Sequence, residues 1–307
     1  MKYTKNDLVS LRQRGAKQHT TDARLHGKLC VITGATSGVG LAAARRLAQG
    51  GAKLVLVARN RDKAETVQQE LVSAYGAEVH IVIADFMRLD EVRRAGEEIR
   101  AAYPVIDILI NSAGLYSMRR KMTPDGNEMT FQVNHLASFM LTMLLINNIS
   151  KSPQGRIIQV NSEGHRFGGL HVRDLDWSIR FYIGLRAYGA SKLAQLLTMR
   201  TIAELLEGTG ATINCMHPGT VGSNIGNNNG PIYRGMMAIA KRLFMKSPVI
   251  SGDALYYLAA APELSKTTGR YFFLTVDVPP MATALDDALR GEIWQKSLEL
   301  TGLTQAL

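Results

Sequence analysis

A tyrosine and a lysine four residues apart open a long helical pattern in the second half of the chain. They are Tyr188 and Lys192 in the run YGASK, and this spacing would place both on one helix face, a turn apart. A phenol with a pKa of about 10 is a poor acid or base at neutral pH. A nearby ammonium and a positively charged oxidised nicotinamide would stabilise the phenolate. The pair predicts proton transfer, although in a chain with 10 tyrosines the spacing alone is weak evidence.

A glycine-rich turn follows the first apolar run. The run LCVIT leads directly into Thr33–Gly40 (TGATSGVG) and then into an amphipathic stretch. Glycines in such a turn permit positive φ and let a pyrophosphate approach the backbone, and the free N–H groups of the next helix attract the anion. The strand before and the helix after supply the context that the motif needs. We therefore predict a dinucleotide site whose contacts are Gly34, Thr36, Ser37, Gly38, Val39 and Gly40.

The end of the second apolar run indicates which dinucleotide binds. An acidic residue there would hold the ribose 2′-hydroxyl of NAD, whereas an arginine accommodates the 2′-phosphate of NADP. The run KLVLVA ends in Arg59-Asn60-Arg61, and the first acid is Asp62. Arginine in a first helical turn opposes the helix dipole, which favours a ligand role over a solvated charge. We predict NADP(H) as the cofactor, with Arg59 as the 2′-phosphate ligand and Arg61 second.

Short β-branched runs alternate with longer helical patterns along the chain, and these elements must position the residues above. The alternation predicts an α/β protein with a single doubly wound, Rossmann-type parallel sheet and helices on both faces. Continuous rather than alternating apolar strands indicate burial on both faces of the sheet. The expected strands are 29–33, 53–58, 79–84, 106–111, 156–161, 211–216 and 270–274. The expected helices include 41–49, 63–74, 91–102, 127–148 and 185–207.

Composition narrows the class of protein. The 307 residues are 46% apolar and 20% charged, which argues against disorder. Cys30 and Cys215 each lie in an apolar run, and no Cys/His cluster suggests a metal. The N-terminus lacks the apolar core of a signal peptide, so a cytoplasmic, reducing environment is expected, with membrane association left open. The net charge of +10 raises nucleic acid, an anionic membrane or a phosphate-bearing ligand as partners.

Further motifs occur in one order along the chain. From about Lys28 onward the sequence resembles the short-chain dehydrogenase/reductase family, in which the glycine turn above matches TGxxxGxG and Tyr188-x-x-x-Lys192 the active-site pair. Five further segments match family motifs: Asp85 after the third strand, Asn111-Ser112-Ala113-Gly114, Asn134 in FQVNHLASF, Ser162 in IIQVNS, and His217–Ser223 in HPGTVGS. The resemblance implies the Rossmann-type fold and a nicotinamide cofactor.

The resemblance also implies a role for each matched residue. A hydride would pass between NADPH and a carbonyl carbon while Tyr188 gives its proton to the oxygen. Ser162 would hydrogen-bond that oxygen, Lys192 would lower the pKa of Tyr188, and Asn134 would support the relay through a water. Together with the turn and Arg59, the implied cofactor contacts are Asp85, Asn111, Ala113, Gly114, Tyr188, Lys192, Pro218, Gly219, Val221 and Ser223.

One branch of the family fits best. The link from Ser162 to Tyr188 is longer than usual, and its SEGH motif resembles the retinol dehydrogenase-like branch, although Asn161 replaces the usual Ser. That branch implies NADP and an apolar carbonyl or alcohol of the retinoid or long-chain aldehyde type. A steroid or other ring ketone is an alternative substrate. A non-catalytic NADP-binding sensor is a second alternative, but it would be expected to lose the Tyr or the Lys.

Most of the positive charge lies in two attachments. Residues 1–28 hold seven basic against two acidic residues, and residues 231–246 hold four basic and none acidic, so these supply +9 of the +10. This weakens nucleic acid as a partner. We expect a basic N-terminal arm at 1–27, a dinucleotide-binding catalytic domain at 28–307, and a substrate lid at about 224–248.

Both attachments leave alternatives open. The alternatives to a lid at 231–246 are a helix packed on the domain and a basic amphipathic helix on a membrane. The N-terminal segment, with a capping pattern at Thr4 and Asp7, reads as an arm on a neighbouring subunit, a cover over the cofactor edge or a frayed tail. A homodimer or homotetramer is compatible with the sequence.

Overall fold

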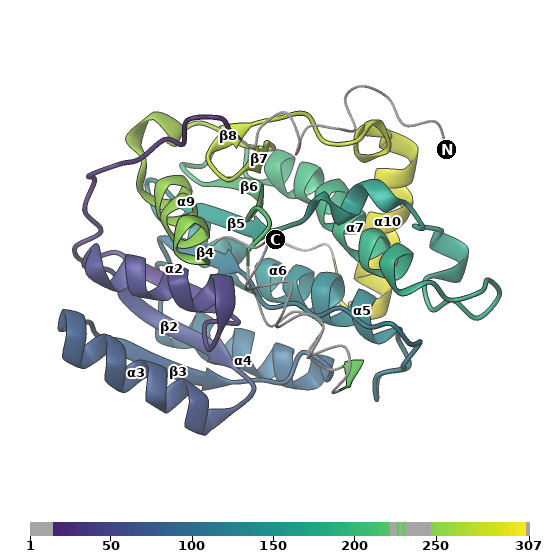
Figure 1. The fold of residues 1–307 in the computed structure, drawn as a ribbon, viewed down its shortest axis with the longest axis horizontal. Coiled ribbons are helices and arrows are strands. Elements are labelled where there is room, and N and C mark those ends of the chain that lie inside the picture. The colour runs from purple at the N-terminus through teal and green to yellow at the C-terminus, as the bar shows by residue number, and fades with distance from the viewer. Residues whose placement is uncertain (1–14, 222–225, 227–228, 231–246, 305–307) are drawn as a thin grey trace.

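A central sheet organises the part of the chain that the structure describes, residues 15–221, 226, 229, 230 and 247–304 of a computed structural model. Its strand order is β3-β2-β1-β4-β5-β6-β7-β8 (Figure 1). The strands are β1 (Leu29–Thr33), β2 (Lys53–Ala58), β3 (Val79–Ile83), β4 (Ile108–Asn111), β5 (Arg156–Val160), β6 (Thr212–His217), β7 (Tyr271–Phe273) and β8 (Val276–Asp277). The order runs outward in both directions from β1, which confirms the doubly wound α/β fold.

All neighbouring strands from β3 to β7 pair in parallel, and only the outermost pair differs. β8 pairs antiparallel to β7, with Phe272 opposite Asp277. The sequence analysis predicts neither β8 nor this exception to a parallel sheet. The reason is its size, because two residues after a tight turn show no strand period.

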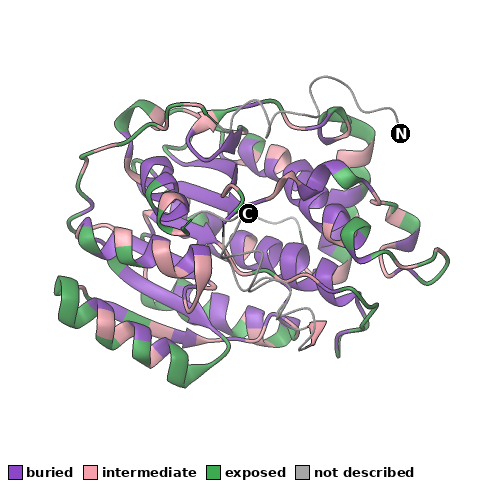
Figure 2. Cartoon of the chain, viewed as in Figure 1, coloured by how far each residue is buried: buried purple, intermediate pink, exposed green. Residues whose placement is uncertain are grey.

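Helices cover both faces of the sheet. On one face α2 (Gly38–Gln49) packs against α3 (Arg61–Tyr75) and α9 (Val249–Ala260). On the other, α4 (Leu89–Ala102) packs against α6 (Ala137–Ser150), and α7 (Gly184–Leu205) and α6 pack against α10 (Asp287–Thr301). The short segments are α5 (Met129–Phe131), the π-helical turn η2 (Gln132–Leu136) and the 3₁₀ turns η3 (Glu163–Phe167), η4 (Val172–Asp174), η6 (Pro262–Leu264) and η7 (Ala282–Leu285). Figure 2 shows the buried sheet between helices whose outer faces are exposed.

One helical prediction needs correction, and two helices are missing from the predicted set. The expected helix at 127–148 is α5, η2 and α6 in succession, because the backbone opens into a π turn at Gln132–Leu136. α9 and α10 are absent from the predicted helices. Most of α9 is apolar and buried, and α10 shows almost no amphipathic period, so neither carries the helical signal used for the others.

One helical stretch of the described chain, Met129–Ser150, is long and apolar enough to span a membrane. Its most apolar window is 89% buried inside the protein. Helices α4, α7 and α10 contact α6 or the π turn within it. We therefore interpret Met129–Ser150 as a core helix of this fold.

The described part of the N-terminal segment lies on the chain's own body. The backbone N–H of His19 donates to Thr275 Oγ1 at 2.8 Å, and the His19 ring stacks on Tyr257 of α9. Farther along, the Tyr256 hydroxyl donates to the carbonyl of Ala23, and Leu25 is buried. Residues 15–27 thus join the β7–β8 turn to α9 and α2. Thr4 and Asp7, the predicted capping residues, lie outside the described residues.

The carboxyl ends of the parallel strands bring the predicted site together. Thr33 of β1 pairs in register with Val57 of β2 and Asn111 of β4, and Asn111 pairs with Gln159 of β5. The loops that follow these strands therefore begin at one edge of the sheet. This edge is where ligands bind in open α/β sheets.

Candidate active site

The glycine turn after β1 and the loop after β4 touch backbone to backbone. Gly34 has φ 70°, and a Cβ placed there would lie 2.8 Å from the Ala113 Cα, so a larger residue would clash. The Thr33 hydroxyl accepts from the backbone N–H groups of Ser112 and Ala113, each at 3.0 Å. These contacts set the spacing of the two loops.

The start of α2 is open to an anion. Ser37 precedes the helix in an extended conformation, and its side chain makes no capping bond within the described chain. The first turn carries no acidic residue. The first N–H groups of a helix have no partner inside it, and the dipole there is positive. The predicted turn residues Thr36, Ser37, Gly38, Val39 and Gly40 all lie at this helix start.

The ends of β2 and β3 flank this turn. The N–H of Gly34 donates to the carbonyl of Val57, two residues before Arg59. Arg59 is exposed, and no other side chain in the described chain pairs with it. Arg61 lies 3.7 Å from Glu65 in α3. Asp85 follows β3, and its carboxylate accepts from the Met87 N–H at 3.0 Å. Of the two arginines, Arg59 is therefore the one whose guanidinium has no acidic partner in the described chain.

The loop after β4 reaches the helical asparagine and the lysine. A Cβ placed on Gly114 would lie 3.2 Å from Asn134 Oδ1 and 4.0 Å from Lys192 Nζ. Asn111 ends β4, and its amide donates to Thr142 Oγ1 at 2.9 Å. Its buried Oδ1 has no partner in the described chain. These contacts join the glycine-turn side of the site to the Tyr–Lys side.

Ser162 and Tyr188 are brought together across the β5–α7 link. Ser162 follows β5, and its hydroxyl accepts from the Gly164 N–H at 3.1 Å and lies beside the Tyr188 phenol. Tyr188 lies in the second turn of α7. A Cβ on Gly164 would come within 2.7 Å of the Tyr188 ring, so the glycine lets this loop lie against the phenol. Two oxygens that can hydrogen-bond one substrate oxygen are therefore adjacent.

Lys192 is held by a buried polar network. Its ammonium donates to the Val160 carbonyl at 2.8 Å and to Gln195 Oε1 at 3.1 Å. The Gln195 amide in turn donates to the Asn134 backbone carbonyl at 2.7 Å. Asn161 donates to the same Gln195 oxygen at 3.1 Å and to the Lys192 carbonyl at 2.9 Å. Gln195 thus connects the ammonium to the backbone of Asn134.

Burial shifts the pKa values of both Tyr188 and Lys192. Burial raises the pKa of Tyr188 to about 12, and the neighbouring Ser162 hydroxyl opposes this rise. Burial lowers the pKa of Lys192 to about 8. Burial and Ser162 are the two causes of the Tyr188 pKa shift, and the lowering of this pKa by Lys192 stays a prediction. The ammonium lies 5.8 Å from the phenol ring centre and is engaged by Val160 and Gln195.

Asn134 sits in the π turn and fixes the loop that leads to Tyr116. Its side-chain oxygen accepts from the Leu115 N–H at 2.7 Å, and its amide donates to the Leu115 carbonyl and to Ser191 Oγ, both at 3.0 Å. The Tyr116 ring meets the Tyr188 ring edge to face, 6.0 Å between centres. The π turn therefore places the side chain of Asn134 against this loop and its carbonyl against Gln195.

Gln195 and His165 contact predicted catalytic residues but are not among the predicted site residues. Gln195 follows Lys192 by three residues, a helical spacing that could have suggested contact. His165 lies in the SEGH motif, and Nδ1 is 2.7 Å from the Ser162 carbonyl, while Nε2 accepts from the Met281 N–H at 3.2 Å. These partners fix a neutral ring with its proton on Nδ1. Burial lowers the pKa of His165 to about 4, in agreement.

The segment after β6 is described in part. The Pro218 carbonyl accepts from Ser251 Oγ at 2.7 Å, Gly219 has φ 78°, and Val221 is buried. Ser223 and most of the predicted lid at 224–248 lie outside the described residues. Asn229 is described, and its side chain bonds the Tyr116 carbonyl and the Met118 N–H, at 3.0 and 2.7 Å. This contact ties residues following β6 to the loop that carries Tyr116.

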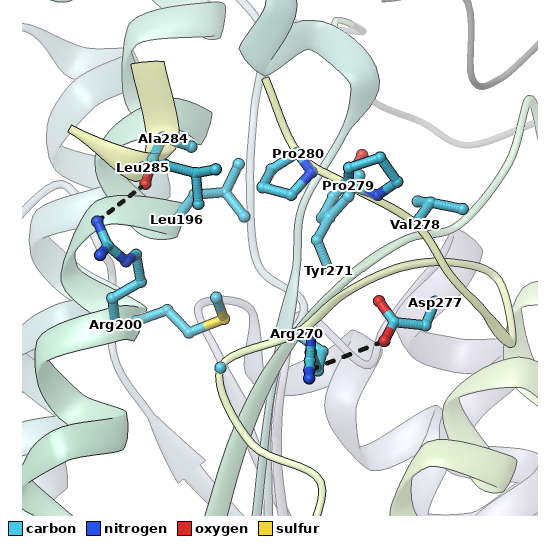
Figure 3. Close-up of a pocket in the computed structure, with 12 residues that line it drawn as sticks. Leu196, Arg200, Arg270, Tyr271, Asp277, Val278, Pro279, Pro280, Ala284 and Leu285 are labelled. Atoms are coloured by element: carbon cyan, nitrogen blue, oxygen red, sulfur yellow. Dashed lines mark hydrogen bonds and ion pairs between the residues drawn. The ribbon is translucent and has the colours of Figure 1, made fainter. Parts of the chain in front are cut away.

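Two cavities lie apart from the Ser162–Tyr188 pair. One of about 390 Å³ is lined by α7, β7, β8 and η7, and its two arginines are engaged, Arg200 with the Ala284 carbonyl and Arg270 with Asp277 (Figure 3). The other, of about 800 Å³, runs along α2 and includes Gly38. Within the described chain, no group of three or more His, Cys, Asp or Glu side chains could hold a metal.

Comparisons with known proteins agree with this geometry. The family model for short chain dehydrogenases matches residues 28–232. Retinol dehydrogenase 14 of Mus musculus is 34% identical, over 91% of this chain and 87% of its own length. Retinol dehydrogenase 13 of Homo sapiens is 33% identical, over 92% and 86%. A Streptomyces protein provisionally named a daunorubicin C-13 ketoreductase is 35% identical, over 93% and 96%.

Solved structures share the fold. A crystal structure of an uncharacterized Mycobacterium paratuberculosis protein has a TM-score of 0.73 and 25% identity, over 95% of this chain and all of that one. A short chain dehydrogenase, so described provisionally, from Shigella flexneri in complex with NADP has a TM-score of 0.65 and 23% identity, over 83% and 99%.

Proposed function

Because this chain belongs to the short chain dehydrogenase family and is thus an oxidoreductase, we propose that it interconverts a carbonyl and an alcohol on an apolar substrate with NADP(H). One observation carries the proposal. Ser162 and Tyr188 lie together at the carboxyl edge of the sheet, where the Gly164 Cβ position is 3.3 Å from the Ser162 hydroxyl and 2.7 Å from the phenol ring, and the buried Lys192 ammonium lies 5.8 Å from that ring's centre. This arrangement supports a role for one group as acid and the other as hydrogen-bond donor to the same substrate oxygen.

The residues present fit a dinucleotide. The Gly34 position leaves no room for a Cβ, and α2 offers uncapped N–H groups to a pyrophosphate. We assign the adenine to Asp85 and the nicotinamide side to Asn111, Ala113, Gly114, Pro218, Gly219, Val221 and Ser223. The free guanidinium of Arg59 favours the 2′-phosphate of NADP over NAD. When bound, the nicotinamide would supply or take up the hydride.

Tyr188 is the proposed general acid in the reducing direction. With its pKa raised to about 12, the phenol is protonated at neutral pH and can give its proton to the carbonyl oxygen. Ser162 would donate a hydrogen bond to the same oxygen and stabilise the negative charge that develops there. His165 holds the Ser162 carbonyl, so the loop that carries the serine is fixed.

Lys192 is proposed to stabilise the phenolate that remains after Tyr188 has given up its proton. An ammonium near a buried phenolate interacts strongly, because the surroundings screen it little. The lysine should also bind the nicotinamide ribose. Asn134 would support the return of the proton to Tyr188 through its backbone carbonyl and a water.

The substrate class rests on the relatives. Retinol dehydrogenases 14 and 13 are among the similar curated proteins, which supports a retinoid or a long-chain aldehyde as the substrate. The ketoreductase relative supports a ring-bearing ketone as the second candidate. Its similarity to this chain, at 35% identity, extends over 96% of the relative's length. A non-catalytic sensor is disfavoured because Tyr188 and Lys192 are both present and adjacent.

The test is Tyr188→Phe with Tyr75→Phe, an exposed tyrosine in α3, as the matched control. Turnover of NADPH with an apolar aldehyde should fall by about 10²–10⁴-fold, as expected for loss of a general acid. The Kd for NADPH, measured by fluorescence quenching, should stay unchanged in both variants. Undiminished turnover in Tyr188→Phe would remove the phenol from the mechanism.

A further inference from the structure

The link between η4 and α7 has an inverted polarity pattern. Ile179 is 80% exposed and Phe181 88% exposed, and Ile183 is also exposed. The residues between them, Arg180 and Tyr182, are more buried and point inward to polar partners. Folded chains normally turn charged residues outward and apolar residues inward. Figure 2 shows this link as an exposed loop that projects beyond α7.

The loop that exposes Ile179 and Phe181 is held in place by hydrogen bonds of the residues between and beside them. The Asp174 carboxylate accepts from the Ile179 N–H at 3.0 Å and from Arg180 Nε at 2.6 Å. The Arg180 guanidinium also lies over the Trp177 ring, 4.2 Å from its centre. The Tyr182 hydroxyl lies 3.2 Å from Glu128 Oε1. These contacts hold the inward residues, so the apolar side chains between them are presented to the outside.

A second segment extends the apolar patch and adds positive charge. The Tyr182 hydroxyl donates to the Ser117 carbonyl at 3.2 Å, so residues 117–122 lie beside the loop. Met118 is 55% exposed, and Met122 is exposed as well. The exposed basic side chains of this neighbourhood that have no acidic partner in the described chain are Arg119, Lys121 and Arg186. We call residues 117–122 and 178–186 together the apolar-basic surface.

The apolar-basic surface borders the candidate active site. Tyr116, which meets the Tyr188 ring, directly precedes its first segment. Its second segment runs into α7, which begins at Gly184, four residues before Tyr188. The apolar-basic surface therefore continues into the two segments that carry Tyr116 and Tyr188.

We propose that the apolar-basic surface docks on an anionic lipid bilayer. Exposed aliphatic and aromatic side chains gain roughly 25 cal/mol per Å² when they leave water. Basic side chains beside them are attracted to anionic headgroups. A second copy fits less well, because a two-fold contact would bring the Arg119, Lys121 and Arg186 charges of both copies into one interface.

The experiment is cosedimentation with phosphatidylcholine vesicles, with and without phosphatidylserine, using the full chain without substrate. The wild type should bind the phosphatidylserine vesicles, and Ile179→Ser/Phe181→Ser should reduce binding by about tenfold, from the apolar area lost. Val72→Ser/Val105→Ser removes two exposed apolar side chains elsewhere and should bind like the wild type. Circular dichroism checks that both variants are folded.

A charge variant separates the two parts of the surface. Arg119→Ser/Lys121→Ser should lose the preference for phosphatidylserine and the sensitivity of binding to salt. The proposal is overturned if the wild type does not bind, or if Ile179→Ser/Phe181→Ser binds equally well. It is also overturned if sedimentation velocity shows a wild-type dimer that this variant dissociates. Since no turnover is measured, the result is independent of the proposed reaction.

Discussion

The glycine turn after β1 and the Lys192 network between β5 and α7 lie at the same sheet edge but are built differently. The turn works through backbone: Gly34 meets Ala113, and α2 leaves its first N–H groups open. The network works through buried side chains, with Lys192, Gln195 and Asn161 joined by hydrogen bonds. Backbone N–H groups are suited to bind the phosphates of a ligand. Buried side chains are suited to proton transfer, because desolvation shifts their pKa values.

The two regions also differ in the burial of their positive charges. Arg59 at the turn is exposed and unpaired in the described chain, so its charge costs the fold little. Lys192 is buried, and its pKa falls to about 8 because the charged form is desolvated. We therefore expect substitutions at the turn to change cofactor binding, and substitutions in the network to change rate, pH dependence and stability.

The largest effect in the proton-handling region apart from Tyr188 is expected at Ser162. Ser162→Ala removes a donor to the developing oxyanion and should lower kcat by about 10²–10³-fold. Steady-state kinetics at saturating NADPH would measure it, with Ser150→Ala, at the end of α6, as the matched control. A comparable loss in NADPH affinity would show that the two regions are not separable in this way.

Arg59 tests the binding side of the comparison. Arg59→Asp should raise the KM for NADPH by roughly 10–100-fold, the value of one charge-assisted contact, with little change for NADH. Lys151→Asp, a charge reversal at an exposed lysine after α6, is the control. Equal effects of Arg59→Asp on both cofactors would place Arg59 outside the 2′-phosphate site.

Gln195 tests whether the network sets a pKa. In the reducing direction kcat/KM should fall above pH 8 or so, as Lys192 loses its proton. Gln195→Leu removes an acceptor for the ammonium, so it should lower kcat/KM by about tenfold and move this alkaline limb to lower pH. Gln195→Glu should move the limb to higher pH. A loss of activity with no shift of the limb in either variant would indicate packing alone.

The smallest effect is expected on stability. The folded pKa of Lys192, about 8, lies below its unfolded value of 10.5, so the charged form destabilises the fold below pH 8 and this cost disappears as pH rises through 10.5. At pH 7 Lys192→Met should raise the free energy of unfolding by roughly 1–2 kcal/mol after the lost bond to Val160 is counted.

Urea denaturation at pH 7 and above pH 10 would measure this difference. The gain from Lys192→Met should be present at the lower pH and vanish at the higher one. A destabilised variant at pH 7 would mean that the hydrogen bonds of the ammonium outweigh its desolvation.

The backbone half of the site could be predicted from sequence more fully than the side-chain half. The spacing of the glycines predicts the turn and the helix that follows it. The alternation of β-branched runs with helical patterns predicts the parallel sheet. Gln195 follows Lys192 at a helical spacing, but Asn161 comes from another element, and its contact with Gln195 depends on how α7 packs on β5. The Tyr188 pKa also depends on burial, which spacing does not report.

The fold shows the same division. The strands that sequence predicts match β1 to β7 within two residues, since continuous apolar runs have clear ends. The π turn at Gln132–Leu136 was hidden, because its residues continue the helical pattern on both sides. α9 was missed because most of its residues are apolar and buried, and β8 because it has only two residues.

A carbonyl panel tests the central claim most directly. Purified protein would be assayed with retinal, a steroid ketone and a long-chain aliphatic aldehyde, each with NADPH and with NADH, following loss of the reduced cofactor. The account predicts turnover of at least one apolar carbonyl, faster with NADPH than with NADH, and its loss in Tyr188→Phe. No turnover of any carbonyl, although NADPH binds, would contradict it and favour a non-catalytic NADP-binding protein.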